Sequence, residues 1–255
     1  MTNLTGRTAL VVGASRGLGR GIALALDKAG APVIAVARDP SALAELTADS
    51  AGIRAEVADA TREEVASELL GRYQPEILVL AAGAIPIGLP LHEQTWETFS
   101  VPWHADVKIA FGWLKAALLA PMRPGGRVIV ISSGAAIFGS PASGGYAGAK
   151  AAQRFIAAYA AEESHRAGLG ITVTAVLPTM TPFGDVGKAG IQAYAARTGK
   201  TENEYLGGMG EPLTPELAGS ALVDLVLRDP GTVAPGYVLT PGGLRDLPAP
   251  APPRP

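Results

Sequence analysis

The sequence of 255 residues contains no cysteine, and this absence excludes disulfide bonds and thiolate catalysis. Its three histidines, His92, His104 and His165, are scattered without the spacing of metal ligands, so we expect no metal site. The formal net charge is only −2 and no run of lysine or arginine occurs, so electrostatics give no reason to expect nucleic acid or an acidic membrane as a partner. No apolar run approaches the ~20 residues of a membrane span.

The first eight residues also lack the apolar core of a secretory signal, and we therefore expect a cytoplasmic location. A hydrophobic content of 48% suffices for a large core, and we expect one domain over residues 1–247. Residues 248–255 consist mostly of proline and alanine without core residues, which predicts a disordered tail.

Short apolar runs alternate with helical patterns along the chain, which predicts an α/β fold with a doubly wound parallel sheet covered on both faces. A capping-box pattern at Thr61 predicts a helix that ends near Gly71. Thr214 and Pro215 are typical of a helix start. Strands are expected at 10–12, 33–37, 53–58, 77–80, 127–132 and 171–177, and helices at 103–119 and 146–166.

A glycine-rich segment directly follows the first apolar run and precedes a helical pattern. Gly13, Gly17 and Gly19 have the spacing G-x-x-x-G-x-G, and no Gly-Lys-Ser/Thr follows, which argues against a P-loop nucleotidase. Glycines in this context let the backbone approach a pyrophosphate, which then lies at the helix N-terminus. The alternative is a tight turn that binds nothing.

Tyr146 and Lys150 lie four residues apart, so on a helix they share one face. An ammonium beside a phenol stabilises the phenolate, which makes the tyrosine a general acid or base. Ser133 follows the strand at 127–132, at the edge of the sheet where ligands bind in open α/β folds. Its hydroxyl either hydrogen-bonds a substrate oxygen or caps the next turn, whereas Ser132 alternates to the opposite face and is expected to be structural.

These residues together resemble the short-chain dehydrogenase/reductase family over about residues 4–247. Gly13, Gly17 and Gly19 match its cofactor glycines, and Ser133, Tyr146 and Lys150 match its catalytic residues in order and spacing. The segments 178–181 and 236–243 resemble its proline-containing segment and its last strand. The resemblance implies a Rossmann-like fold, a nicotinamide cofactor, a small carbonyl or alcohol substrate, and a homodimer or homotetramer.

The second strand ends in a pattern that indicates which nicotinamide cofactor binds. NAD-binding members carry an acid at the position of Ala37, whereas Arg38 and Arg16 match bases that accommodate the 2′-phosphate of NADP. Asp39 is expected to point away. Asp59 resembles a residue that contacts adenine, and the alternative is a plain turn or cap residue. We therefore expect NADP(H). Further residues expected to contact it are Ser15, Leu18, Ala82, Gly83, Pro178 and Thr181, in addition to Tyr146 and Lys150.

The chain departs from the family at two places. The family's Asn-Asn-Ala-Gly is Leu80-Ala81-Ala82-Gly83 here, which removes polar bracing. Asp106 aligns with the family's fourth catalytic residue, an asparagine. Its carboxylate could hold a relay water, pair with Lys150, or lie exposed without a role.

Three functions remain open on the sequence. The first is an NADP(H)-dependent reductase of carbonyls or dehydrogenase of secondary alcohols, with reduction favoured. The second is a relative that reduces an activated C=C bond, and the third is an NADP-binding module with weak or no catalysis. Residues 179–213 lack clear periodicity and are expected to form a mobile lid over the substrate. Phe183, Tyr194, Tyr205 and Met209 in this lid favour an apolar or aromatic substrate.

Overall fold

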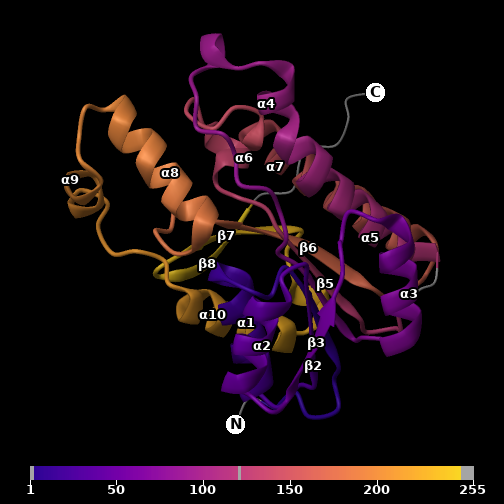
Figure 1. Cartoon of the computed structure of the whole chain (residues 1–255). Coiled ribbons are helices and arrows are strands. Elements are labelled where there is room, and N and C mark those ends of the chain that lie inside the picture. Colours follow the sequence, from indigo (N-terminus) through magenta and orange to yellow (C-terminus); the bar gives the residue numbers. More distant parts are fainter. Residues whose placement is uncertain (1–2, 120–121, 248–255) are drawn as a thin grey trace.

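A single sheet runs through the centre of the computed structural model, which describes residues 3–119 and 122–247 (Figure 1). Within these residues the strand order is β3-β2-β1-β4-β5-β6-β7-β8. All neighbours pair in parallel except β7 and β8, which are antiparallel. The strands are β1 (Ala9–Val12), β2 (Val33–Ala37), β3 (Ile53–Val57), β4 (Ile77–Leu80), β5 (Arg127–Ile131), β6 (Thr172–Pro178), β7 (Gly236–Thr240) and β8 (Gly243–Asp246).

The central strands are buried on both faces, and their sequences are accordingly continuous apolar runs rather than alternating ones. β1 pairs with β2 on one side and with β4 on the other, so the winding of the chain reverses there. Ligands bind at such a switch point, beyond the carboxyl ends of the strands. The predicted Rossmann-like α/β fold is confirmed, and its strands end within two residues of the expected positions.

Helices cover both faces of the sheet. Ile22, Leu43 and Leu222 from α1, α2 and α10 join one apolar core, and Val65, Trp113 and Ala157 from α3, α5 and α7 join the other. The bounds of the long helices are α1 (Gly17–Lys28), α2 (Pro40–Asp49), α3 (Glu63–Tyr73), α5 (Lys108–Leu119), α7 (Tyr146–Arg166) and α10 (Pro215–Leu227).

The expected helix at 103–119 begins earlier than the sequence indicated. Thr95 and Thr98 form a capping box that opens α4 (Trp96–Pro102), which continues through a π-helical turn (Trp103–Val107) into α5. Pro102 directly precedes the expected helix, yet the chain stays helical from α4 through the π-helical turn into α5.

One further expectation about helices was wrong. α3 begins at Glu63 and no side chain caps it, because Thr61 donates its hydroxyl to Asp59 instead of capping the helix. The segment 179–213, in which the sequence shows no clear periodicity, contains α8 (Gly184–Arg197) and α9 (Glu202–Gly207). The helical pattern of α8 is weak because only Ile191 and Ala195 are buried. The helix start at Thr214 is confirmed, since its side chain accepts from the Leu217 N–H.

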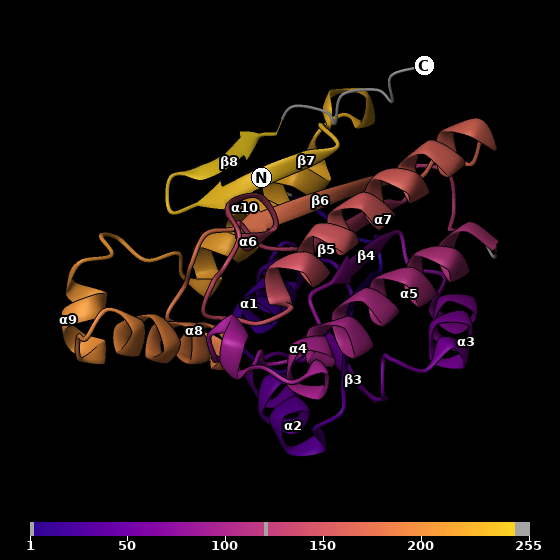
Figure 2. The same ribbon diagram turned by 90° about the horizontal axis from the view of Figure 1, so that it is seen from above.

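α8 and α9 project beyond the carboxyl ends of the strands (Figures 1 and 2). α6 (Ala135–Phe138) lies in the connection between β5 and α7, and short 3₁₀ turns occur at Leu91–Glu93 and Pro230–Thr232. Among the described helices, none combines the length and apolarity needed to cross a membrane. The predicted disordered tail at 248–255 falls outside the described residues.

Candidate active site

A cavity of about 870 Å³ lies at the carboxyl ends of the strands. Every candidate catalytic and cofactor-binding residue named from the sequence lines it. The lining includes Ser15, Leu18, Ala82, Gly83, Pro178 and Thr181, which were expected to contact the cofactor. Residues far apart in the chain therefore meet at one site, as the switch point of the sheet requires.

The glycine-rich turn lies against the segment that follows β4. Gly13 has a φ of +88°, and a Cβ there would lie 2.4 Å from the Ala82 nitrogen. A Cβ at Gly19 would lie 2.1 Å from the Gly13 carbonyl oxygen. α1 starts at Gly17, and no side chain caps its N-terminus in the described structure. Its free N–H groups and the flat backbone surface fit the pyrophosphate of a dinucleotide.

The two candidate phosphate-binding arginines have different surroundings. Arg16 forms an ion pair with Asp185, the second residue of α8, and its guanidinium lies 3.7 Å from Asp39 Oδ2. Asp39 therefore does not point away as expected: it caps α2 through Oδ1 and faces Arg16 through Oδ2. Arg38 is exposed, and no described carboxylate lies within ion-pair distance of it. Arg38 is thus the arginine available to an incoming anion.

Asp59 lies after β3 at the same end of the cavity. The N–H and hydroxyl of Thr61 donate to its Oδ1 at 3.0 and 2.8 Å. These hydrogen bonds, aided by the positive charge of Arg38, hold the pKa of Asp59 below its usual value. The carboxylate is therefore ionised at neutral pH and fixed in orientation.

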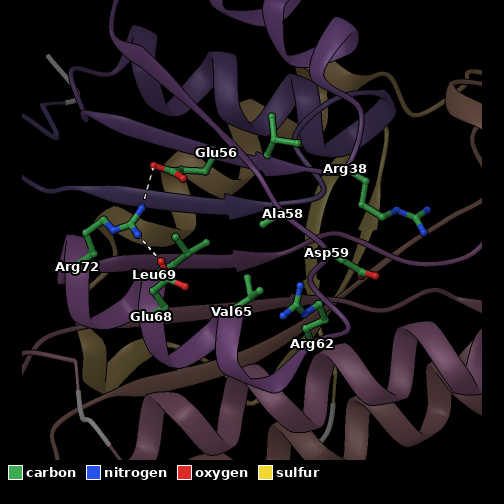
Figure 3. Close-up of a pocket in the computed structure, with 10 residues that line it drawn as sticks. Arg38, Glu56, Ala58, Asp59, Arg62, Val65, Glu68, Leu69 and Arg72 are labelled. Atoms are coloured by element: carbon green, nitrogen blue, oxygen red, sulfur yellow. Dashed lines mark hydrogen bonds and ion pairs between the residues drawn. The ribbon is translucent and has the colours of Figure 1, made fainter.

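A second, smaller cavity of about 410 Å³ lies beside Arg38 and Asp59, between β3 and α3 (Figure 3). Arg72 in this cavity is held by Glu56 and Glu68, and Arg62 pairs with Glu64. Because these arginines already have carboxylate partners, the second cavity adds no free positive charge to the site.

Tyr146 is the first residue of α7, and Lys150 lies one turn later on the same face. The Lys150 Nζ lies 5.6 Å from the centre of the Tyr146 ring, and it donates to the Ile131 carbonyl at 3.2 Å. The Lys150 side chain is buried, with 7% of its surface exposed. The predicted juxtaposition of phenol and ammonium is present.

Asp106 is buried in the π-helical turn, and its Oδ1 lies 2.9 Å from the Lys150 Nζ. The N–H of Ala84 donates to Oδ2 at 2.8 Å, and the Gln153 amide donates to the Asp106 carbonyl at 2.9 Å. Burial alone would lower the pKa of Lys150, but the charge of Asp106 and the neighbouring Tyr146 raise it overall. Of the three sequence-based alternatives, Asp106 thus takes the pairing with Lys150.

Ser133 lines the cavity two residues beyond β5, and its hydroxyl oxygen accepts from the Ala135 N–H at 3.2 Å. This contact is the turn-capping role considered from the sequence, and it leaves the hydroxyl proton free for a ligand in the cavity. Ser132 is buried and donates to the Lys150 carbonyl at 2.8 Å, a structural contact as expected.

The sequence did not identify Asp185, Gln153 or Ser140 as residues of this region. Asp185 meets Arg16 across 169 positions of the chain, and no local pattern marks such a pair. Gln153 is a buried amide in an alanine-rich helix, and that isolated polar residue was a usable signal. Ser140 hydrogen-bonds Tyr194 of α8 at 2.8 Å.

Comparison with known proteins decides the family. The family model described as short chain dehydrogenase matches residues 7–191, well over half of the sequence. The chain belongs to the short-chain dehydrogenase family. It is accordingly an oxidoreductase, and its family binds a nicotinamide cofactor and small-molecule substrates.

Two curated relatives carry the names of reductases. A hydroxynaphthalene reductase-like protein of Metarhizium robertsii is 33% identical over 187 residues, covering 69% of this chain and 68% of its own. L-xylulose reductase of Bos taurus is 32% identical over 187 residues, covering 71% and 75%. A short-chain dehydrogenase of Burkholderia cenocepacia, solved in complex with NADP, has a TM-score of 0.78, 24% identity and coverage of 94% and 98%. The similarity to this structure shows the fold alone.

Proposed function

We propose that this short-chain dehydrogenase is an NADP(H)-dependent oxidoreductase that converts a carbonyl and the corresponding secondary alcohol into one another, chiefly as a reductase. The observation that carries the proposal is the shared cavity of Ser133, Tyr146 and Lys150 next to the glycine-rich turn. When bound, the nicotinamide supplies the hydride for reduction and accepts it for oxidation.

Three side chains act on the substrate oxygen or on the group that protonates it. The Tyr146 hydroxyl gives its proton to the carbonyl oxygen in reduction and takes one from the alcohol in oxidation. The Ser133 hydroxyl donates a hydrogen bond to the same oxygen and orients it. The Lys150 ammonium, buried near the Tyr146 ring, stabilises the phenolate that remains after proton transfer.

Asp106 sets the direction in which this arrangement works best. The Lys150 ammonium is attracted to both the Asp106 carboxylate and the phenolate. The negative charge of Asp106 therefore weakens the stabilisation of the phenolate by Lys150. Phenolate is the form needed for oxidation, and the protonated phenol is the form needed for reduction. A carboxylate in place of a neutral amide therefore favours the reductive direction.

NADP(H) is proposed as the cofactor because Arg38 is free at the end of β2, where an acid would bind the ribose of NAD. Arg16 contributes once its guanidinium exchanges Asp185 for the phosphate. The NADP in the Burkholderia cenocepacia structure supports this choice by fold likeness.

A homodimer or homotetramer is part of the proposal. Phe111 on α5 and Phe155 and Tyr159 on α7 are 48%, 44% and 60% exposed, on two helices that lie side by side (Figure 2). Aromatic side chains of this size on adjacent helices are typical of an interface. Sedimentation velocity of the wild-type protein tests the oligomeric state. A dimer or tetramer is expected, and a monomer would contradict this part of the proposal.

The function is tested by following NADPH oxidation with a panel of ketones, aldehydes and activated alkenes, alongside calorimetric titration of NADPH. Turnover of a ketone or aldehyde supports the proposal. Turnover of alkenes alone would assign the C=C reduction instead. Tight NADPH binding without turnover of any compound would indicate a binding module.

A further inference from the structure

The cavity continues past Tyr146 into a region enclosed by three segments. The chain after β4 contributes Ile85, the loop around α6 contributes Phe138 and Ser140, and α8 contributes Val186 and Ala193. Within the described residues, the charged side chains that line the cavity are Arg16, Arg38, Asp39, Asp59, Asp106, Lys150 and Asp185.

None of these charges lies free at the substrate end. Arg38 and Asp59 follow β2 and β3 at the adenosine end, where Arg16 is also paired with Asp185 and near Asp39. Asp106 and Lys150 neutralise each other below Tyr146. A charged substrate such as a 2-oxo acid would therefore lose its hydration without gaining a counter-charge, at considerable cost.

Apart from Ser133 and Tyr146, the serine and tyrosine hydroxyl groups at the substrate end are engaged with the protein. The Ser140 and Tyr194 hydroxyls bond each other at 2.8 Å, and the Ser143 hydroxyl donates to the Ser140 carbonyl at 3.2 Å. A polyhydroxylated ketone would need several hydrogen-bond partners at this end of the cavity, and few side-chain hydroxyl groups remain unbonded there. A polar substrate would thus leave buried hydroxyls without hydrogen bonds.

α8 presents small residues to this end of the cavity. Ala189, Gly190 and Ala193 recur at helical spacing beside Val186 and Tyr194, and all five line the cavity. A Cβ added at Gly190 would meet no atom within 4 Å. The small side chains leave room for a flat ring between the helix and the floor of the cavity.

We infer that the substrate end of this cavity takes a neutral, apolar, ring-bearing ketone, with Gly190 and its neighbours on α8 determining the size accepted. The inference rests on the proposed function for the ketone group of the substrate. The selection against charged and hydroxylated substrates follows from the residues that line the cavity. Burial of an apolar ring supplies the binding free energy at about 25 cal/mol per Å².

Binding can be measured without turnover, which separates this inference from the proposed reaction. Calorimetry in the presence of NADP⁺ compares 1-tetralone, cyclohexanone, a ketopentose and a short 2-oxo acid. The two ring ketones should bind at least ~10-fold more tightly than the ketopentose and the oxo acid. Equal or tighter binding of either polar compound, or no binding of the ring ketones, would overturn the inference. Binding of 1-tetralone, with no reduction of any ketone or aldehyde in the panel, would sustain the inference and overturn the proposed reaction.

A matched pair of lid variants tests the role of α8. Gly190→Leu places a side chain into the open space, and leucine suits a helix better than glycine. Its binding of 1-tetralone should fall ~10-fold or more, with cyclohexanone affected less and NADP⁺ affinity unchanged. Gly207→Leu on α9 is the control, since a Cβ there also meets nothing within 4 Å and Gly207 lies outside the cavity lining. Equal 1-tetralone binding in both variants would show that Gly190 does not limit the size of the substrate.

Discussion

The Lys150 ammonium lies 2.9 Å from a carboxylate oxygen of Asp106, and both side chains are almost fully buried. A buried ion pair survives only if its other polar atoms find partners, and here the Ala84 N–H and the Ile131 carbonyl supply them. The same ammonium faces the Tyr146 ring, so the carboxylate and the phenol compete for one positive charge. This competition is the basis of the first prediction.

Asp106→Asn should shift the ascending limb of the pH–rate profile for alcohol oxidation to lower pH by ~1 unit, because Lys150 then acts on the phenolate alone. The charge of Asp106 raises the pKa of Lys150 more than Tyr146 does, so the variant also lowers that pKa. Steady-state oxidation of a substrate alcohol across pH gives the profile, and thermal unfolding checks that the variant is folded. An unchanged pH–rate profile in a folded variant would show that Asp106 does not act electrostatically on the reacting groups.

Tyr146→Phe should reduce turnover by ~10²-fold or more while leaving NADPH affinity nearly unchanged, because it removes the positioned acid and little else. Tyr73→Phe at the end of α3, outside the cavity lining, is the control and should retain turnover. The comparison needs kcat for both variants and a cofactor titration. Normal turnover in Tyr146→Phe would remove the tyrosine from the mechanism.

Wild type should bind NADPH at least ~10-fold more tightly than NADH, and Arg38→Ala should abolish most of this difference. The arginine acts on the 2′-phosphate, so NADH binding should change little. Arg62→Ala, which removes an arginine already paired with Glu64, is the control. Fluorescence titration with both cofactors measures the effect, and an unchanged NADPH/NADH ratio in Arg38→Ala would contradict it.

Asp185→Asn should tighten NADPH binding by roughly 2- to 5-fold, since the lid carboxylate no longer competes with the 2′-phosphate for Arg16. The effect is small because exposed ion pairs contribute only ~0.2–1 kcal/mol. NADH, which lacks that phosphate, should bind as before. Asp224→Asn on the exposed side of α10 makes the same charge change away from the cavity and should alter neither affinity.

Trp113→Phe should lower the free energy of unfolding by about 1–3 kcal/mol, because the fully buried indole donates to the Ala60 carbonyl at 3.0 Å and phenylalanine cannot. Denaturant unfolding measures this loss. Trp96→Phe, at a residue that is 68% exposed, should change stability by less than ~0.5 kcal/mol. Equal stability of the two variants would argue against a structural role for the indole hydrogen bond.

Local patterns predicted most of the fold because apolar strands, glycine turns and helix caps depend on neighbouring residues. The strands and the glycine-rich turn lie where the sequence indicated, and the candidate residues share one cavity. α8 was missed because alanine and glycine carry no clear apolar stripe. The orientation of Asp39 was wrong because its partner, Arg16, belongs to another loop. Such contacts arise only when distant segments fold together.

The π-helical turn at Trp103–Val107 fixes the rotational phase between α4 and α5. Each residue in an α-helix turns the chain by about 100°, so deleting one residue here and relaxing to regular geometry would rotate everything on one side relative to the other. The buried Ser100 on α4 and the buried Trp113 on α5 could then no longer both keep their places, and Asp106 lies in the turn between them. The length of this one turn therefore couples the packing of the protein to the charge beneath Tyr146.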